Sequence, residues 1–457
     1  MPSTAPAAAR AAVACDSAAF LRYLDRFSRF DASKLQAARY LSSKLSPEQI
    51  LLDVAMNSHR RDLLPVNEGY CVDLRRASLV PREKGHFFSR AIWLPPKIFP
   101  RVPRGSRFEI PLSSLSPLSS SSPSPFVESL MLRVFGGDSE LVAWIQKLFG
   151  LYLTGEKYSK MVCLSGEGGN GKSVLARWLG RILGGFAQMN CPKALLFDAA
   201  AASSSAAGAG GGAGARDYGM RQDMLSRAVN DLEARRLVVC DEVGSDLCLS
   251  DDKFKQITGG GDTMTARRLH QDARPVDTSQ CKILTLANPP FFEVASTEAF
   301  RRRLLVFEMP CRFTSNAAEV DHVSVHPAVD PSALDAAMDA HLGEFFFWCV
   351  EGSSRYYSEG IDDEPAAVVA STAKFFSDQD VVVQFLEQAP LEHTGDAEDG
   401  VSLQELAEMW AHSGLGRIST RSLGKLLRSR SGKFRYSGMH VVVGGRKSRG
   451  VVGWRRA

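Results

Sequence analysis

The fold is decided by the stretch Gly166-Glu167-Gly168-Gly169-Asn170-Gly171-Lys172-Ser173, which fits the pattern GxxxxGK[ST]. It follows the apolar run from Met161 to Ser165, and apolar residues recur at helical spacing from Ser173 to Leu183. Glycines let the backbone curl so that successive N–H groups point inward, and the positive end of the following helix dipole lies at the same place. The sequence therefore predicts a strand, a phosphate-binding loop and a helix. Lys172 is expected to reach the β and γ phosphates of a nucleotide, and Ser173 to hold Mg²⁺. A glycine-rich turn that matches by chance is the disfavoured alternative.

Two further apolar strands are expected, and each ends in polar residues. Leu237 to Cys240 precedes Asp241 and Glu242, and Lys282 to Leu286 precedes Asn288. Asp241 is suited to the Mg²⁺ shell, and Glu242 to orienting and deprotonating an attacking water. Asn288 is suited to contact the γ-phosphate or the water. A solvated acidic turn is the alternative for the acids, and an ordinary Asn-Pro turn for Asn288. Short apolar strands separated by helices favour a parallel α/β sheet.

Three adjacent arginines follow the third strand, in Phe300-Arg301-Arg302-Arg303. Such a run is usually solvated or faces nucleic acid. At this point of the chain, one of the three could also act as an arginine finger across a subunit boundary.

The order of these motifs resembles the superfamily 3 helicases. The resemblance is strongest to the helicase half of poxvirus-type and phage- and plasmid-type primase-helicases. Beyond the motifs already quoted it rests on Thr258 to Asp262, Thr265 to Leu269, Leu63 to Leu74 and Gly150 to Gly155. It covers about residues 20 to 315.

The resemblance implies an AAA+-like P-loop ATPase that forms a ring, usually a hexamer, and translocates on single-stranded or forked DNA. ATP and Mg²⁺ are the implied cofactors. The implied site residues are, for ATP, Gly166, Glu167, Gly168, Gly169, Asn170, Gly171, Lys172 and Ser173; for the metal, Ser173 and Asp241; and for catalysis, Lys172, Glu242, Asn288, Arg302 and Arg303. The segment from Thr265 to Pro275 is similar to the family's pore hairpin, so Arg267, Arg268, His270 and Arg274 are its candidate DNA contacts.

The upstream part of the chain leaves no room for a primase catalytic domain, so we expect a helicase without primase activity, with a separate primase or polymerase as a possible partner. Residues 18 to 52 carry helical periodicity, and a single helix is expected over 126–153. Residues 199 to 215 are Ala, Ser and Gly, which predicts a disordered insertion.

The last 57 residues hold 12 Lys+Arg and 2 Asp+Glu, whereas the whole chain carries a net charge of only +4. Two helices are expected at 401–412 and 419–428, followed by strands at 434–443 and 451–454. Helix, turn, basic helix and β-wing is the outline of a winged helix-turn-helix. Its candidate DNA contacts are Arg421, Lys425, Arg428, Arg446 and Lys447. A solvated α+β cap is the alternative.

The expected fold class is α/β, an AAA+-like P-loop core with a helical N-terminal region and a C-terminal winged-helix-like α+β domain. The expected parts are a tail at 1–14, a pre-helicase region at 15–110, a Ser/Pro-rich linker at 111–125, the ATPase domain at 126–315 with the insertion at 199–215, a helical connector at 316–378 and the basic domain at 379–457.

Composition excludes several classes of protein. The chain of 457 residues is 44% hydrophobic and 23% charged, ordinary for globular proteins. The nine cysteines form no CxxC pair, which argues against zinc and a disulfide framework. No apolar run is long enough to span a bilayer, and no signal-peptide pattern opens the chain. We expect no membrane partner and an intracellular location: the nucleus or a viral replication site, or else the cytoplasm.

Three functions follow in order of support. The first is an ATP-driven DNA helicase of replication. The second is an origin-binding or loading factor that uses ATP without separating strands. The third, a small-molecule kinase, is disfavoured by the Asp-Glu strand end, the arginine run and the basic tail.

Overall fold

The computed structural model describes residues 60–66, 70–81, 92, 110–111, 126–199, 224–259, 264–267, 272–289, 291–294, 298–379, 385, 389–394, 396, 399–413, 418–428, 436–443 and 446–456. The chain divides into two compact units. The first comprises Met1–Glu293 and Arg303–Val368, and the second Val294–Arg302 and Val369–Ala457. Several predicted features lie outside the described residues: the tail at 1–14, the helical stretch at 18–52, the Ser/Pro-rich linker from 112 on and the insertion from 200 on.

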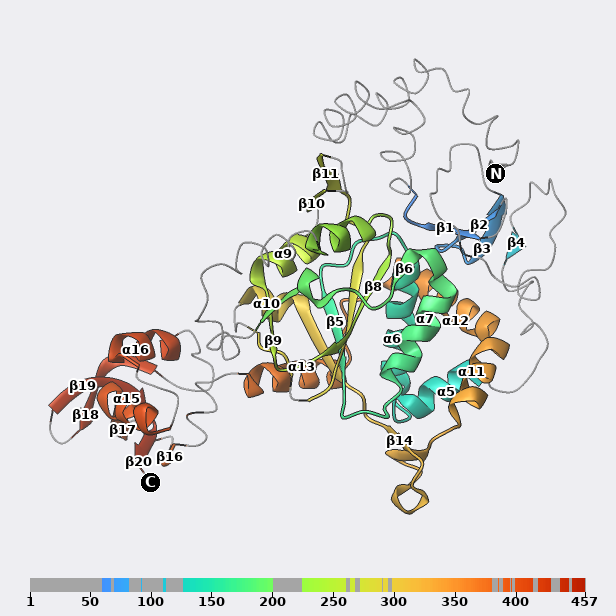
Figure 1. The fold of residues 1–457 in the computed structure, drawn as a ribbon. Helices are drawn as coiled ribbons and strands as arrows, with labels where there is room; N and C mark the ends of the chain where they lie inside the picture. Colours follow the sequence, from blue (N-terminus) through green and yellow to red (C-terminus); the bar gives the residue numbers. More distant parts are fainter. Residues whose placement is uncertain are drawn as a thin grey trace, which may run out of the picture. The chain divides into compact units, whose positions relative to one another are not determined.

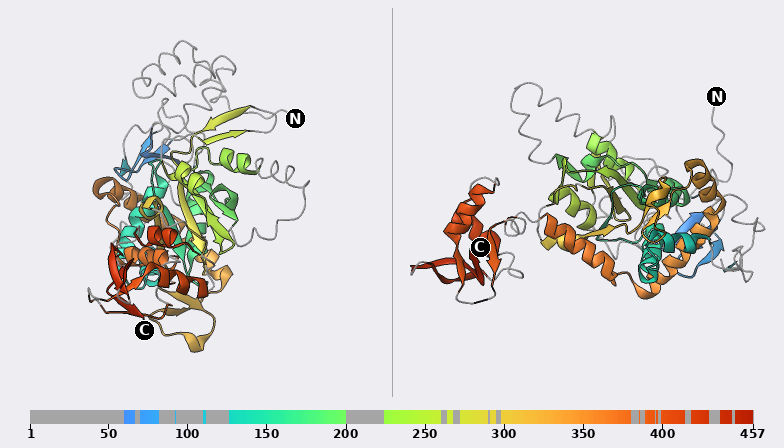
Figure 2. Two further views of the ribbon diagram at one scale, coloured as in Figure 1. Left: turned by 90° about the vertical axis from the view of Figure 1, so that its left-hand side faces the viewer. Right: turned by 90° about the horizontal axis from the view of Figure 1, so that it is seen from below.

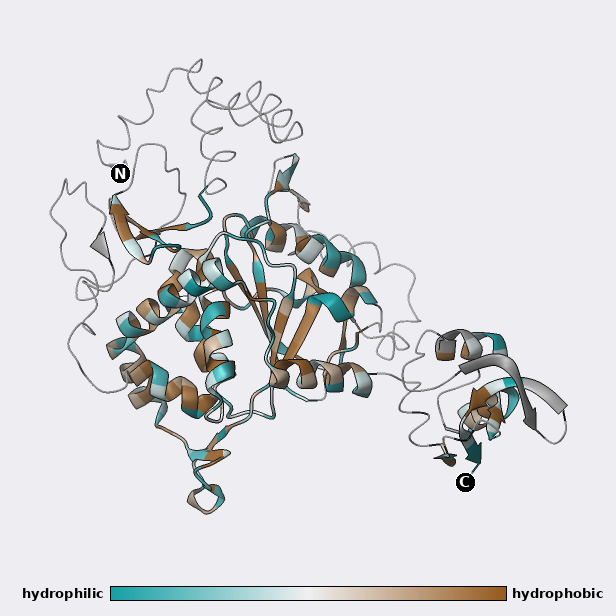
Figure 3. Ribbon diagram, turned by 180° about the vertical axis from the view of Figure 1, so that it is seen from behind, coloured by the Kyte–Doolittle hydropathy of each residue, from teal (hydrophilic) through white to brown (hydrophobic). Residues whose placement is uncertain are grey.

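The first unit is built on a five-stranded, all-parallel sheet with the strand order β13-β5-β12-β8-β6 (Figure 1). The strands are β5 (Met161–Ser165), β6 (Ala187–Gln188), β8 (Leu237–Val243), β12 (Lys282–Ala287) and β13 (Leu304–Glu308). The three strands expected from apolar runs are all present, and the predicted parallel α/β core is confirmed. Strands buried on both faces carry continuous apolar runs, and Figure 3 draws this sheet as mostly hydrophobic.

One face of the sheet packs on a layer of helices. The core there joins alternate residues of the strands to α5 (Phe126–Val134), α6 (Ser139–Leu153), α7 (Lys172–Leu183) and α12 (Leu342–Glu359). Two tryptophans of these helices are almost fully buried, and Trp178 of α7 stacks on Phe345 of α12 with ring centroids 4.1 Å apart. Figure 1 shows α9 (Asp251–Gly259) on the other side of the sheet.

The prediction of a single helix over 126–153 is wrong, because the structure has two helices there, α5 and α6. Gly136 and Gly137 adopt φ of +68° and +79°, a left-handed conformation that ends α5. Asp138 then caps α6 by accepting the N–H of Leu141 at 2.9 Å. Apolar residues recur at helical spacing on both sides of the two glycines, so the periodicity alone did not indicate that the helix ends there.

Helices α6 and α12 approach closely because each has a glycine at the crossing. A Cβ on Gly150 would lie 2.1 Å from the backbone N of Ser353, and one on Gly352 would lie 2.0 Å from the carbonyl of Gln146. The helices of the expected connector, α11 (Pro331–Ala340) and α12, therefore pack with the sheet unit. Only α13 (Ala366–Asp378) runs on into the second unit.

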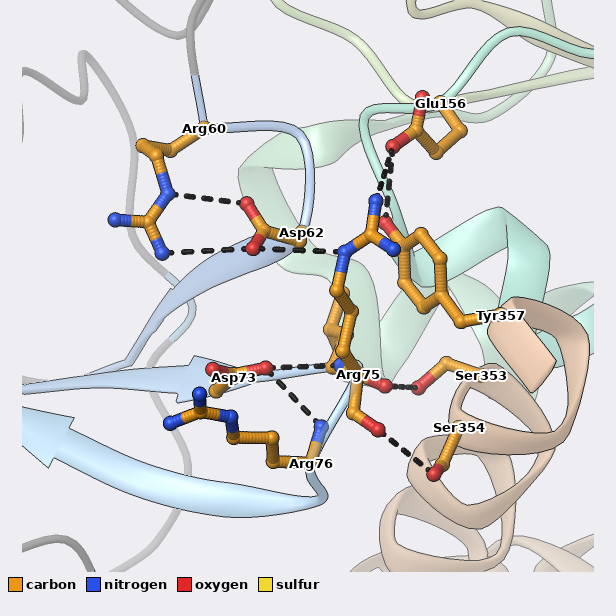
Figure 4. Close-up of polar contacts among 10 residues, drawn as sticks. Arg60, Asp62, Asp73, Arg75, Arg76, Glu156, Ser353, Ser354 and Tyr357 are labelled. Atoms are coloured by element: carbon orange, nitrogen blue, oxygen red, sulfur yellow. Dashed lines mark hydrogen bonds and ion pairs between the residues drawn. The ribbon is translucent and has the colours of Figure 1, made fainter.

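A small antiparallel sheet precedes the helices, with strands β1 (Leu63–Val66), β2 (Tyr70–Asp73), β3 (Ser78–Pro81) and β4 (Ile110–Pro111). The stretch from Leu63 to Val80 thus contains three strands, and residues 67–69 lie outside the described residues. The β2–β3 turn is closed by Asp73, which accepts the N–H groups of Arg75 and Arg76 (Figure 4).

This turn docks on α12. Ser353 and Ser354 donate to the carbonyls of Leu74 and Arg75 at 3.0 and 2.9 Å. The Arg75 guanidinium lies 4.0 Å from the centre of the Tyr357 ring and 3.7 Å from a Glu156 oxygen (Figure 4). Polar and cation–π contacts therefore fix the N-terminal sheet against α12 within the first unit.

Two fully buried side chains, Arg236 and Lys282, hold the segment at the end of α6, and Arg236 also joins it to β1. Arg236, just before β8, donates to the carbonyls of Leu63 and Leu153, and Lys282 donates to those of Thr154 and Glu156. Burial lowers the pKa of Arg236 to about 10, and it lowers the pKa of Lys282 strongly.

The second unit carries a three-stranded antiparallel sheet of order β17-β19-β18, formed by β17 (Gly400–Ser402), β18 (Tyr436–Val443) and β19 (Arg446–Val452). Between β17 and β18 lie α15 (Leu403–His412) and α16 (Thr420–Arg428). Ser402 caps α15 in a capping box with Glu405. A further pair joins β16 (Leu391–His393) to β20 (Trp454–Arg456).

None of the helices in the described part of the chain has the length and apolar character needed to cross a bilayer.

Candidate functional site

The loop between β5 and α7, residues Gly166 to Gly171, is called the glycine loop below. Gly168, Gly169 and Gly171 have φ of +106°, +65° and +84°. A Cβ on Gly168 or Gly171 would meet nothing within 4 Å, so the backbone conformation, and not crowding, requires glycine there. At Gly169 a Cβ would also lie 2.9 Å from the carbonyl of Phe313. The curled backbone leaves N–H groups to bind an anion.

Asn170 fastens the loop from inside. Its side-chain oxygen accepts the N–H of Gly168 at 2.9 Å, and its side-chain nitrogen donates to the carbonyl of Cys311 at 2.9 Å. The N–H of Phe313 donates to the carbonyl of Gly169 at 2.8 Å. The segment after β13 therefore supports the loop, a contact that the sequence motif did not predict.

Lys172 is buried, with 6% of its surface exposed. Its Nζ donates to the carbonyl of Gly166 at 2.8 Å and to Asn170 Oδ1 at 3.4 Å. Burial lowers the pKa of Lys172, while the charge of Asp241 acts in the opposite direction. The ammonium is thus held inside the loop by neutral oxygens, which an anionic group can replace. Ser173 is exposed in the first turn of α7.

Asp241 and Glu242 lie near the carboxyl end of strand β8, at the same end of the sheet as the glycine loop. Asp241 is half-buried and Glu242 is exposed. The strand is longer than expected and includes both acids. The N–H of Glu242 donates to Asp241 Oδ1 at 2.8 Å. Glu242 has φ of +53°, which is uncommon for any residue other than glycine.

Asn288 follows β12 directly and is exposed. The neighbouring Ala287 pairs with Ser165 of β5 on one side and with Val243 of β8 on the other. The carboxyl ends of parallel strands meet at one edge, so the glycine loop, the two acids and Asn288 share that edge.

Arg303 ends α10 (Glu298–Arg303) and precedes β13, whose first residue Leu304 pairs with Met161. It therefore lies at the amino edge of the sheet, one strand length of about 16 Å from the glycine loop. In the second unit, Arg302 lies 3.9 Å from Glu298 on the same helix, and Arg301 lies over the ring of Phe376.

The hairpin of β10 (Met264–Arg267) and β11 (Ala273–Val276) stands away from the sheet (Figures 1 and 2). Arg267 is exposed at the end of β10, and Asn230 donates to its carbonyl at 3.1 Å. Arg274 forms a two-pronged ion pair with Glu233, at 2.9 and 2.5 Å. Arg268 and His270 lie outside the described residues.

In the second unit, Arg421 is exposed on α16. The side chains of Lys425, Arg428, Arg446 and Lys447 lie outside what the structure describes. Among the described residues, no group of three or more His, Cys, Asp or Glu side chains could hold a metal ion alone. The cysteines described in the structure are free thiols.

Comparison with known proteins finds no matching family model and no match among the curated proteins. Among solved structures, the chain is similar to the A form apo structure of the NrS-1 C terminal region. The two are 14% identical, the match covers 74% of this chain and 78% of that one, and the TM-score is 0.41. A second A form and another apo structure of that region, residues 305–718, match at 12% identity and a TM-score of 0.38 over the same shares. Similarity at this level carries no argument about function, which we therefore infer from the geometry.

Proposed function

We propose that this chain is an ATP-driven DNA helicase of replication, which hydrolyses Mg-ATP in a ring oligomer and moves along single-stranded DNA. The observation that carries the proposal is the meeting of four features at one edge of the parallel sheet. These are the glycine loop with its positive-φ glycines, the buried Lys172, the paired acids and Asn288. The five-stranded parallel sheet, of order β13-β5-β12-β8-β6, is compatible with the P-loop core that we propose.

The site residues have distinct chemical tasks. The N–H groups of the glycine loop and the start of α7 bind phosphate oxygens. Lys172 exchanges its carbonyl partner for the β and γ phosphates, which stabilises the charge that develops during transfer. A bound Mg²⁺ would be held by Ser173, Asp241 and phosphate oxygens and would neutralise part of that charge.

Glu242 is assigned as the base. It takes a proton from water as the water oxygen attacks the γ-phosphorus, and the bond to the β–γ bridging oxygen breaks to release ADP. Asn288 is placed to orient the water or the γ-phosphate. The third candidate of the sequence analysis, a kinase, would need an acceptor site in place of this water.

The position of Arg303 supports the proposal of a ring. At the amino edge of its own sheet it is about 16 Å from its own glycine loop. Arg303, or its neighbour Arg302, could complete the site of an adjoining copy, as an arginine finger does. We propose a homo-oligomer, most simply a hexamer.

DNA contacts are assigned to the β10–β11 hairpin and to the second unit. On the hairpin, the ion pair of Arg274 with Glu233 fixes β11, so the phosphate contacts fall to Arg267, Arg268 and His270 toward the tip. The order β17-β19-β18, with two helices inserted after β17, fits a winged-helix-like domain. Arg421, Lys425 and Arg428 on α16 and Arg446 and Lys447 on β19 would contact the phosphate backbone.

The test is ATP hydrolysis by the full chain with and without single-stranded DNA, together with particle mass by light scattering with and without ATP. We expect DNA to stimulate hydrolysis, ATP to support a ring, and Lys172→Ala to abolish turnover. A forked-duplex assay distinguishes the alternative. Hydrolysis and ring formation without strand separation would favour an origin-binding or loading factor, and a monomer that binds no adenine nucleotide would contradict both.

A further inference from the structure

The two acids of β8 lie in a bulge of the sheet. Thr285 of β12 pairs with Cys240, and Ala287 pairs with Val243, so Asp241 and Glu242 together face the single residue Leu286. Consecutive residues of a regular strand point to opposite faces, which would separate two adjacent carboxylates. A bulge re-aims side chains, and bulges are common beside active sites but rare between parallel strands.

The bulge is held from both sides of Glu242. On the N–H side, Asp241 Oδ1 accepts the N–H of Glu242 at 2.8 Å. On the carbonyl side, Lys193 Nζ donates to the main-chain carbonyl oxygen of Glu242 at 2.5 Å. Glu242 has φ of +53°, and a non-glycine residue stays in that conformation only where its surroundings enforce it.

Lys193 is well placed to enforce it because its own backbone is fixed. It begins a short 3₁₀ turn, Lys193–Leu195, just after β6. The N–H of Cys191 donates to the Val239 carbonyl at 2.8 Å, which extends the pairing of β6 with β8. Behind Lys193, the side chains of Leu195 and Leu196 are fully buried. The exposed side chain of Lys193 therefore reaches Glu242 from a backbone that is anchored on both sides.

We infer that Lys193 is a positioning residue for ATP hydrolysis, which acts by holding the Asp241–Glu242 bulge in the conformation that aims the Glu242 carboxylate at the attacking water. The inference rests on the proposed function, and it assigns a role to a residue outside the motifs. Lys193 touches the main chain of Glu242 and not its carboxylate, so its loss should slow the chemical step without weakening nucleotide binding.

The experiment compares Lys193→Met and Lys193→Arg with the wild-type chain in steady-state ATP hydrolysis with single-stranded DNA. We expect Lys193→Met to lower kcat by about 10- to 100-fold, the range for a misplaced catalytic group, with KM for ATP changed by less than about twofold. Lys193→Arg should recover most of the rate, because a guanidinium can donate to the same carbonyl.

A double-mutant cycle tests whether Lys193 acts through Glu242. In a Glu242→Gln background, Lys193→Met should have no further effect on kcat, because the group that it positions is gone. The matched control is Lys253→Met. Lys253 also donates to a main-chain carbonyl, that of Phe197 at 3.4 Å, and pairs with Asp198, but it does not touch β8. Its kcat should equal that of the wild type.

Three outcomes would overturn the inference while leaving the proposed function intact. They are an unchanged kcat in Lys193→Met, a rise in KM alone, and an equal loss of kcat with or without the Glu242 carboxylate. Thermal melting of each variant shows whether a loss of rate reflects unfolding, and rescue by Lys193→Arg separates positioning from a general structural role. Absence of hydrolysis in the wild-type chain would instead remove the proposed function, and this inference with it.

Discussion

A buried lysine lies at the carboxyl edge of the five-stranded sheet, where the strands end, and another lies at the amino edge, where they begin. Comparing them shows that the same side chain can have different roles. Lys172 at the carboxyl edge is 6% exposed, and Lys282 at the amino edge is fully buried. Both donate to main-chain carbonyls, and burial lowers the pKa of both. Burial and a shifted pKa therefore do not distinguish a site from a structural element here.

The partners of the two lysines differ. Lys282 and its neighbour Arg236 bind carbonyls of β1 and of the segment at the end of α6, far away in the chain. Lys172 binds the carbonyl of Gly166, six residues earlier in its own loop. Loss of the first contacts would separate elements of the fold, whereas loss of the second would free only a loop. Lys172 can therefore turn to an incoming anion at little cost in stability.

Replacing each lysine by methionine tests the difference between the two. Lys172→Met should lower ATP turnover by about 10²- to 10³-fold, as loss of one preorganised donor does. Its unfolding free energy should stay within about 1 kcal/mol of wild type, because one net hydrogen bond is lost. Steady-state kinetics and urea unfolding measure the two effects.

Lys282→Met is the matched control and should show the reverse, with turnover retained and stability lowered. Equal stability losses in the two variants would mean that both lysines are structural.

The next effect concerns Arg236. Arg236→Met leaves the carbonyls of Leu63 and Leu153 without their donor, which should cost about 2–5 kcal/mol of unfolding free energy. Fluorescence of Trp144 and Trp178, both in the core of the first unit, follows this transition in urea. Arg236→Lys should lose less because it retains a donor. A loss below about 0.5 kcal/mol would show that this edge is not held by its cations.

The carboxyl edge could be predicted from sequence because its chemistry is local. Glycines at 168, 169 and 171, a lysine and two acids after an apolar strand each carry their signal within a few residues. The strands and α7 followed from the same runs, and the structure agrees within a few residues.

The rest could not be predicted because it depends on contacts distant in sequence. Arg236 and Lys282 begin strands, and nothing nearby indicates that their partners lie in β1 and after α6. Lys193 lies some 50 residues from Glu242 and belongs to no motif. Nothing near Arg274 in the sequence indicates that Glu233 is its partner. The apolar periodicity of 126–153 was correct on both sides of Gly136 but did not show the break.

A smaller effect on stability should distinguish a glycine with positive φ from one with ordinary backbone conformation. Gly168→Ala forces an alanine to φ near +106°, which should cost about 1–3 kcal/mol although space for the methyl group is available. Gly259→Ala, at the end of α9 with equal space, should be neutral or stabilise by up to about 1 kcal/mol. The midpoints of urea unfolding, at an unchanged slope m of free energy against urea concentration, compare the two variants. Equal midpoints would contradict the conclusion that the backbone conformation at position 168 requires glycine.

The smallest expected effect is a dependence of stability on pH at the amino edge. Burial holds the pKa of Lys282 well below its ordinary value, so between the two values the unfolded chain binds a proton that the folded chain does not. Its contribution to stability is therefore complete above the unfolded pKa of about 10.4 and is lost as the pH falls through the folded pKa. Between these limits the unfolding free energy should rise with pH by up to about 1.4 kcal/mol per unit. Urea unfolding at pH 9 and pH 10, between which the expected change is at most about 1.4 kcal/mol, measures this slope. Lys282→Met should flatten this slope, and the control Lys253→Met, at a half-buried lysine of α9, should not. An unchanged slope in Lys282→Met would assign the proton to another group.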